Sequence, residues 1–80
     1  MYTVYLKRSA EKELKELPPK VHDKIIKVLL SLRENPFPRN AKKLHGREGV
    51  RIRAGNYRVL YLVDDEKKKI EVVAVGDRKF

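Results

Sequence analysis

The sequence has no cysteine and no tryptophan, and only four of its 80 residues are glycine. The absence of cysteine excludes disulfides and thiolate metal sites. No apolar run approaches the roughly 20 residues that span a bilayer. The short apolar run Tyr2–Leu6 is followed at once by charged residues, which does not fit a signal peptide. We therefore expect a soluble, cytoplasmic protein.

Acidic residues are also scarce: the sequence has 11 of them and 20 lysines and arginines, which gives a net charge of +9. In a small domain this balance indicates a polyanionic partner, such as nucleic acid, an anionic membrane surface or an acidic protein. A solvated, charge-rich surface is the alternative, since 39% of the residues are charged. The length fits one domain over residues 1–80 with a single core.

The first part of the chain predicts a strand and a short helix. Tyr2–Lys7 alternates between apolar and polar residues, which is typical of a strand. Ser9 is suited to cap the helix that follows. One apolar stripe at helical spacing then comprises Ala10, Leu14 and Leu17. Pro18 ends this helix, because proline disfavours a helical conformation in the residue before it.

A second helix is predicted from Pro19, a residue suited to the first helical position. Apolar residues keep the helical period up to about Asn35, and Leu30 is expected to widen the buried stripe. Two antiparallel helices joined by a proline turn follow from this spacing. The segment Asn35–Asn40 (NPFPRN) has the composition of a loop.

The second half of the chain is rich in predicted strands. A basic connector over Ala41–Gly49 precedes them, and the strands themselves are Val50–Ala54, Tyr57–Val63 and Ile70–Val75. The order β-α-α-β-β-β predicts an α+β fold, in which the N-terminal helix hairpin packs on one face of an antiparallel sheet.

Arginines recur on one side of the first two of these strands. Arg51 and Arg53 alternate with apolar residues, and Gly55-Asn56 is suited to a two-residue hairpin turn with glycine in the first position. This turn places Arg53 directly opposite Arg58. Like charges in that position destabilise a hairpin by something within about 0.2–1 kcal/mol. An anionic ligand between the two side chains would explain why the sequence has them there.

Arginine narrows the chemistry of such a site. Its planar guanidinium binds phosphate through two hydrogen bonds and stays charged, so it stabilises negative charge but cannot act as a general base. The connector adds positive charge at the rim of the site through Lys42, Lys43 and Arg47, for which we expect contacts with a nucleic-acid backbone. A solvated loop is the alternative for these three residues.

The residues just described resemble the RelE/ParE superfamily of toxins from toxin–antitoxin modules. The similarity covers nearly the whole chain, and its most specific part is RIRAGNYRVLY, followed by VAVGDRK near the C-terminus. The resemblance implies the RelE-like α+β fold. It also implies an antitoxin as the physiological partner.

The RelE branch of this superfamily cuts mRNA in the ribosomal A site. The resemblance therefore implies the ribosome and mRNA as targets, and a reaction without metal or cofactor in which the ribose 2′-OH attacks the adjacent phosphate. The residues at the matching positions are Arg51, Arg53, Arg58 and Arg78. By position, Arg58 and Arg78 hold the scissile phosphate, while Arg51 and Arg53 steady the backbone and favour ionisation of the 2′-OH.

The sequence departs from the RelE pattern in two places. RelE-type enzymes often carry lysines at the first two basic positions, and often a tyrosine several residues after the last arginine, whereas this sequence has two arginines and ends at Phe80. The general base is therefore open, with His45 and Glu48 as the nearby candidates. A ParE-like inhibitor of gyrase and a non-catalytic RNA- or ribosome-binding homologue remain the alternatives.

Overall fold

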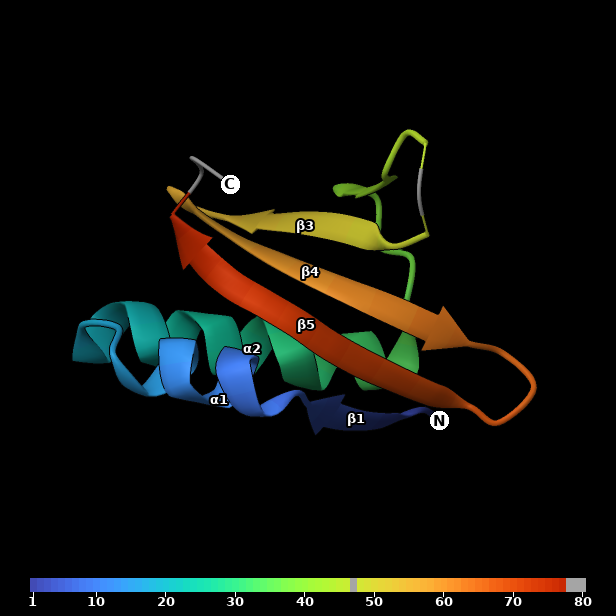
Figure 1. Ribbon diagram of the computed structural model, residues 1–80, viewed down its shortest axis with the longest axis horizontal. Coiled ribbons are helices and arrows are strands. Elements are labelled where there is room, and N and C mark those ends of the chain that lie inside the picture. Colours follow the sequence, from blue (N-terminus) through green and yellow to red (C-terminus); the bar gives the residue numbers. More distant parts are fainter. Residues whose placement is uncertain (47, 78–80) are drawn as a thin grey trace.

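In a computed structural model, residues 1–46 and 48–77 are described, and both helices lie along one face of the sheet (Figure 1). The elements follow in the order β1 (Thr3–Leu6), α1 (Arg8–Lys15), α2 (Pro19–Glu34), β2 (Ala41–Lys43), β3 (Val50–Ala54), β4 (Tyr57–Asp64) and β5 (Lys69–Asp77). The predicted α+β class and the N-terminal pair of helices are confirmed.

The five strands lie in the order β1-β5-β4-β3-β2. The pairs from β5 to β2 are antiparallel, as expected, but β1 runs parallel to β5, with Val4 beside Ile70. The sheet is therefore mixed rather than wholly antiparallel. Alternation in the sequence locates a strand but does not identify its neighbour. Here the neighbour of β1 lies at the far end of the sequence.

The basic connector over residues 41–49 begins with a strand that the sequence did not predict. Ala41 pairs with Ile52 and Lys43 with Val50, so β2 adds a fifth strand at the edge of the sheet. Three residues with only one small apolar side chain give no detectable alternation. The open edge of β3 is what makes this segment extended.

The two helices confirm one prediction and correct two. Pro19 is the first residue of α2, as expected from its fixed φ. The cap predicted at Ser9 is wrong, because α1 begins at Arg8 with Lys7 in the N-cap position and without a side-chain cap bond. Leu30 does not widen the buried stripe either, since 54% of its surface is exposed.

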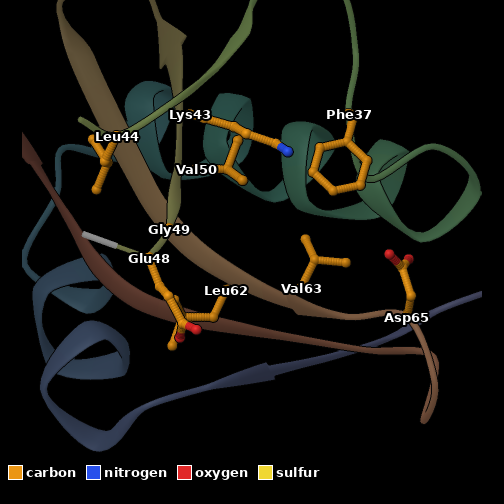
Figure 2. A pocket seen from close by; sticks show the side chains of 9 residues that line it. All are labelled: Phe37, Lys43, Leu44, Glu48, Gly49, Val50, Leu62, Val63 and Asp65. Atoms are coloured by element: carbon orange, nitrogen blue, oxygen red, sulfur yellow. The ribbon is translucent and has the colours of Figure 1, made fainter. Parts of the chain in front are cut away.

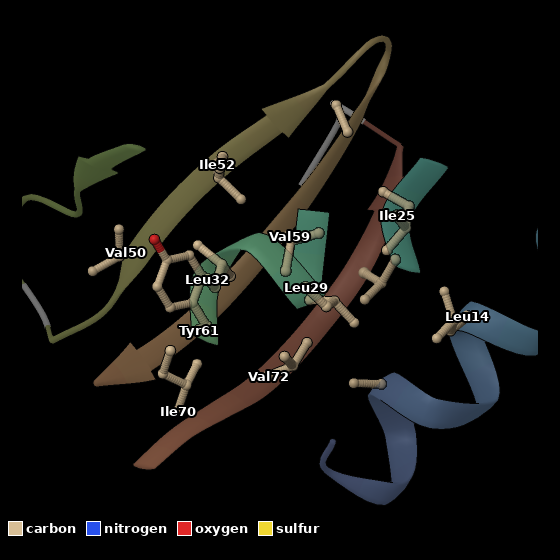
Figure 3. Packing of buried hydrophobic residues seen from close by; sticks show 13 residues of the cluster. Leu14, Ile25, Leu29, Leu32, Val50, Ile52, Val59, Tyr61, Ile70 and Val72 are labelled. Carbon is tan, nitrogen blue, oxygen red and sulfur yellow. The ribbon is translucent and has the colours of Figure 1, made fainter. Parts of the chain in front are cut away.

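The core lies between the helices and the sheet (Figure 3). Leu29 of α2 and Val59 of β4 are among its buried residues. Tyr61 is fully buried, and its hydroxyl donates a hydrogen bond of 2.6 Å to the backbone oxygen of Pro36. Burial raises the pKa of Tyr61 to about 12. This bond ties the NPFPRN loop to the centre of the sheet.

A β-bulge interrupts the pairing of β4 with β5. Leu60 lies opposite Ala74, but the next residue, Tyr61, lies opposite Val72, so Val73 has no counterpart on β4. One extra residue in a strand reverses the alternation of side chains beyond it.

The bulge changes which side chains of β5 face the helices. Val72 and Val75 are three residues apart, yet both are buried in the core. The residues of β5 that lie opposite Arg58 and Leu60, on the other face of the sheet, are consequently Gly76 and Ala74.

Candidate functional site

The β3–β4 hairpin has the register that the sequence predicted. Arg53 pairs with Arg58, and Ala54 pairs with Tyr57. Gly55 takes a φ of +64°, the left-handed value that a type II′ turn needs at its first position. Arg53 is exposed and Arg58 is half-buried. The two arginines thus lie directly opposite one another beside a tight turn.

The two sides of this hairpin differ in character. Buried residues face the helices, namely Ile52, Ala54, Val59 and Tyr61. Arg51, Arg53 and Arg58 lie on the other side, together with Leu60 and Leu62, as the register requires. We call this second side the arginine face.

Lys42 joins the arginine face through β2. It lies directly opposite Arg51, and opposed residues of antiparallel strands share a face. A cup of about 180 Å³ is lined by Asn40, Lys42, Arg51 and Arg53. The side-chain amide of Asn40 donates to the backbone oxygen of Arg53 over 3.3 Å, which holds the loop against the strand. The cup presents three cations and an amide to solvent.

Lys43 lies on the opposite face. It pairs with Val50, a core residue, and its Nζ lies 6.0 Å from the centroid of the Phe37 ring. Figure 2 shows this ammonium directed toward the ring. A cation over an aromatic face is a favourable contact. The structure therefore separates two lysines that are adjacent in the sequence.

Two of the predicted site residues, Arg47 and Arg78, lie outside the described residues. The described structure thus brings together Lys42, Arg51, Arg53 and Arg58 and places Lys43 elsewhere.

The charges of the cup are not matched by carboxylates within residues 1–46 and 48–77. The side-chain pairs of basic and acidic residues in this part of the chain lie on the helices. Lys15 Nζ is 3.4 Å from Glu11 Oε1, and His22 Nδ1 is 3.4 Å from Asp23 Oδ1. Neither Arg51 nor Arg53 has an acidic partner among these residues. Their charge is available to an anion from solution.

The cavity in Figure 2 is larger, at about 350 Å³, but suits an anion less well. It lies at the other end of β3 and contains the carboxylates of Glu48 and Asp65 with a single cation, Lys43. Repulsion by two carboxylates disfavours a phosphate there. The cup on the arginine face is the better candidate.

Beside the cup, the arginine face becomes apolar. A cavity of about 200 Å³ is lined by Leu44, Leu60 and Leu62, with Glu48 at its edge. Leu44 reaches the sheet because Gly49 has no side chain: a Cβ on Gly49 would lie 3.1 Å from Leu44 Cδ1. Glu48 is exposed, as is His45 in the same loop. Both predicted base candidates are therefore accessible to a ligand.

Metal ligands do not gather in the described part of the chain, where no group of three His, Asp or Glu side chains is suited to an ion. None of the described helices is both long and apolar enough to cross a membrane.

Comparison with known proteins identifies the family. The family described as "ParE toxin of type II toxin-antitoxin system, parDE" matches residues 4–80. A protein of Escherichia coli named as a RelE-like toxin is 35% identical over 81 residues, which cover 98% of this chain and 84% of that protein. The chain belongs to the RelE/ParE toxin superfamily.

Solved structures of RelE-type complexes agree with this assignment. The RelBE2 toxin–antitoxin complex of Mycobacterium tuberculosis contains a chain with a TM-score of 0.84 and 32% identity, covering 96% of this toxin and 98% of that chain. The intact E. coli RelBE complex gives a TM-score of 0.80 and 30% identity, with both chains fully covered. The fold of this RelE/ParE toxin is therefore RelE-like.

Sequence reasoning missed two parts of the toxin's site. Asn40 lies in a loop without periodicity, so nothing in the sequence indicated its bond to Arg53. The second is the cavity that Leu44 and Leu62 line beside Gly49, whose backbone φ is +132°. The available signal was Gly49 in the predicted connector, because glycine permits a backbone conformation with positive φ.

Proposed function

We propose that this toxin is a ribosome-dependent endoribonuclease that cuts mRNA in the A site and is held inactive by an antitoxin in the cytoplasm. Its RelE-named relatives and the likeness to chains from solved toxin–antitoxin complexes support this proposal. The geometry of the sheet is a separate argument for nuclease activity, because it does not depend on how the relatives are named.

The observation that carries the proposal is the opposition of Arg53 and Arg58. Cβ atoms of directly opposed residues are about 4.5–5.5 Å apart, so two guanidinium stems leave the sheet side by side. Arg51 and Lys42 add two more cations on the same face. A phosphate neutralises this repulsion and accepts paired hydrogen bonds from the guanidinium planes.

The reaction that suits this arrangement is an internal transesterification. The ribose 2′-oxygen forms a bond to phosphorus and the bond from phosphorus to the 5′-oxygen breaks. The 5′-oxygen takes up a proton from solvent as it leaves, so the products are a 2′,3′-cyclic phosphate and a 5′-OH. Negative charge develops on the phosphoryl oxygens as the new bond forms. Arg58 is placed to stabilise that charge, and Arg51 and Arg53 to hold the backbone. By its sequence position, Arg78 is expected to stabilise the same charge together with Arg58.

The proton of the 2′-OH needs an acceptor that the arginines do not supply, because they remain protonated. Glu48 and His45 are our candidates, since both lie exposed in the loop beside the apolar part of the arginine face. In the cleavage assay below, Glu48→Gln and His45→Ala test them. The base is the group whose loss removes the acidic limb of the pH–rate profile, where cleavage rises as the base is deprotonated, or abolishes cleavage while binding persists.

Cleavage on programmed ribosomes tests the proposal. We expect Arg58→Ala to lower the rate by about 100-fold or more, because a donor to the developing charge is lost. Lys42→Ala should lower it several-fold by weakening contact with the backbone. Lys43→Ala is the matched control, since it removes the same charge from the opposite face and should leave the rate near that of the wild type. Intact mRNA with wild-type toxin at stoichiometric concentration contradicts the proposal.

Ribosome binding measured on the same variants separates catalysis from simple binding. If Arg58→Ala abolishes cleavage but still binds, Arg58 has a catalytic role. An equal, salt-sensitive loss of binding by Arg58→Ala, without cleavage by the wild type, supports a non-catalytic binder.

A ParE-like inhibitor of gyrase is the second candidate, because the matching family is described as a ParE toxin. That activity needs a protein target and no nuclease site. It does not account for Arg53 opposite Arg58. A DNA-supercoiling assay run beside the cleavage assay decides between the two: inhibition of gyrase with intact mRNA selects the ParE-like function.

A further inference from the structure

The last residues of β5 have a neighbouring strand on one side only. β1 ends at Leu6, opposite Val72, and the N–H of the next residue, Lys7, donates to the Val72 oxygen over 2.9 Å. β5 continues beyond this point to Asp77, where its pairing partner among the described strands is β4 alone. A strand held from one side opens more readily than one held from both.

This part of β5 lies beside an arginine of the proposed cleavage site. Gly76 pairs with Arg58, and the bulge at Val73 interrupts the ladder shortly before it. Because Gly76 has no side chain, the main chain of β5 is what lies next to Arg58. In the sequence, Arg78 follows two residues after Gly76. A shift in the last residues of β5 would therefore disturb the surroundings of Arg58.

A carboxylate from α1 contacts β5 where β1 no longer does. Glu13 Oε1 accepts a hydrogen bond of 3.0 Å from the Val75 N–H, one residue before Gly76. α1 lies along β5 in this part of the molecule (Figure 1). Glu13 is half-buried and follows the buried core residue Ala10 by three positions, so both lie on the same side of the helix. A hydrogen bond from a backbone N–H to a carboxylate is stronger than one to a neutral acceptor.

The neighbouring carboxylate of α1 has a different environment. Glu11 is exposed, and its Oε1 lies 3.4 Å from Lys15 Nζ on the surface of the helix. An apolar residue in place of Glu13 would extend the core, but it would remove the acceptor of the Val75 N–H. The carboxylate at position 13 is thus suited to fixing β5 rather than to filling the core.

We propose that Glu13 is a positioning residue for RNA cleavage, whose carboxylate fixes the last residues of β5 and thereby the place of Arg58 relative to the scissile phosphate. This inference rests on the endoribonuclease activity of the proposed function. Glu13 comes from the helix side of the sheet, whereas Arg58 lies on the arginine face, so Glu13 does not touch the reacting atoms. Loss of its hydrogen bond lowers the rate of the chemical step, while the exposed cations still bind the ribosome.

Single-turnover cleavage on programmed ribosomes, measured over a range of toxin concentrations, tests this role. Glu13→Ala should lower the maximal rate by about 10-fold and change the half-saturating concentration by less than about 2-fold. Glu13→Gln should recover most of the rate, because its amide oxygen still accepts a hydrogen bond. Glu13→Asp keeps the charge but withdraws the acceptor by one methylene, so it should remain slow. Glu11→Ala is the matched control, since it removes the same charge from the same helix without a bond to β5.

Amide hydrogen exchange of the free toxin gives a second measurement, which needs no RNA. In Glu13→Ala, exchange at Val75 should be faster than in the wild type by about 10-fold or more, because its N–H loses the acceptor. Amides of the β3–β4 hairpin should keep their wild-type rates. A general loss of stability would instead raise both, so the comparison separates a local effect from partial unfolding.

The alternative outcomes differ from one another. Cleavage by Glu13→Ala at the wild-type rate overturns the positioning role alone. An equal loss in Glu13→Gln also overturns it, because the charge rather than the hydrogen bond would then matter. If Glu13→Ala does not fold, equal rates for Glu13→Asp and Glu13→Gln have the same meaning. Intact mRNA with the wild-type toxin overturns the proposed function itself, and the positioning role in cleavage with it.

Discussion

At the scale of single residues, the alternation of side chains along a strand decides which charges lie on the same face of the sheet. Lys42 and Lys43 are neighbours in the sequence, yet one lies opposite Arg51 and the other opposite Val50. Sequence analysis grouped both with the site because it predicted a loop there. A three-residue strand is enough to turn the second lysine toward the helix side of the sheet.

Tyr61 gives a prediction at this same scale. Tyr61→Phe should lower the free energy of unfolding by about 1 kcal/mol at neutral pH, because the hydrogen bond to Pro36 is lost. The pKa of Tyr61 is about 12 in the folded state against an ordinary value of 10.0. Its contribution to stability is therefore complete below pH 10 and is lost as the pH rises from 10 to 12.

Urea denaturation between pH 7 and pH 12 measures both effects. Stability of the wild type should fall more steeply through pH 10–12 than that of Tyr61→Phe, which cannot ionise at this position. Lysines titrate in the same range in both proteins, so the difference between the two slopes is the relevant quantity. Tyr5→Phe, at a residue that is 49% exposed, is the control and should change neither value. Equal slopes of stability against pH for the wild type and Tyr61→Phe would contradict this account.

At the scale of elements, the hairpin and the helices follow local rules that the sequence reveals. The register of Arg53 with Arg58 follows from the length of the turn, and Pro19 marks a helix start. The partner of β1 and the bulge at Val73 depend on contacts between distant segments. No local pattern encodes such contacts. The cations of the arginine face could therefore be predicted from the sequence, but Asn40 could not.

The loop from Leu44 to Gly49 gives a prediction for an element. Gly49→Ala should lower the free energy of unfolding by about 1–3 kcal/mol, because its φ is +132° and the added Cβ would press on Leu44. Gly46→Ala is the control, since Gly46 also has positive φ (+73°) but open space around it. Thermal denaturation compares the two, and a smaller loss for Gly49→Ala than for Gly46→Ala would contradict this account.

At the scale of the whole molecule, the positive charge behind the net value of +9 is unevenly distributed. Four described cations gather on the arginine face, while Arg33, Lys7 and Arg8 flank the edge strand β1 on the far side of the sheet. The positive charge is thus concentrated at two separate places on the sheet.

Ribosome binding should accordingly weaken as salt rises, because cations on the toxin displace counterions from RNA. In a plot of log K against log salt concentration, Lys42→Ala should reduce the slope by about 1, the value expected for one lost phosphate contact. Lys43→Ala should leave the slope unchanged, since Lys43 faces the helix side of the sheet. Identical slopes for the two variants would show that Lys42 makes no such contact.

The bulge in β5 has a consequence for what a substrate would touch. Because one extra residue reverses the strand, the positions facing Arg58 and Leu60 are occupied by Gly76 and Ala74, the two smallest side chains in that strand. Beside Arg58 and Leu60, strand β5 thus contributes little more than main chain to the arginine face. If the proposed function holds, an RNA strand on this face would meet the main chain of β5 rather than large side chains at these two positions.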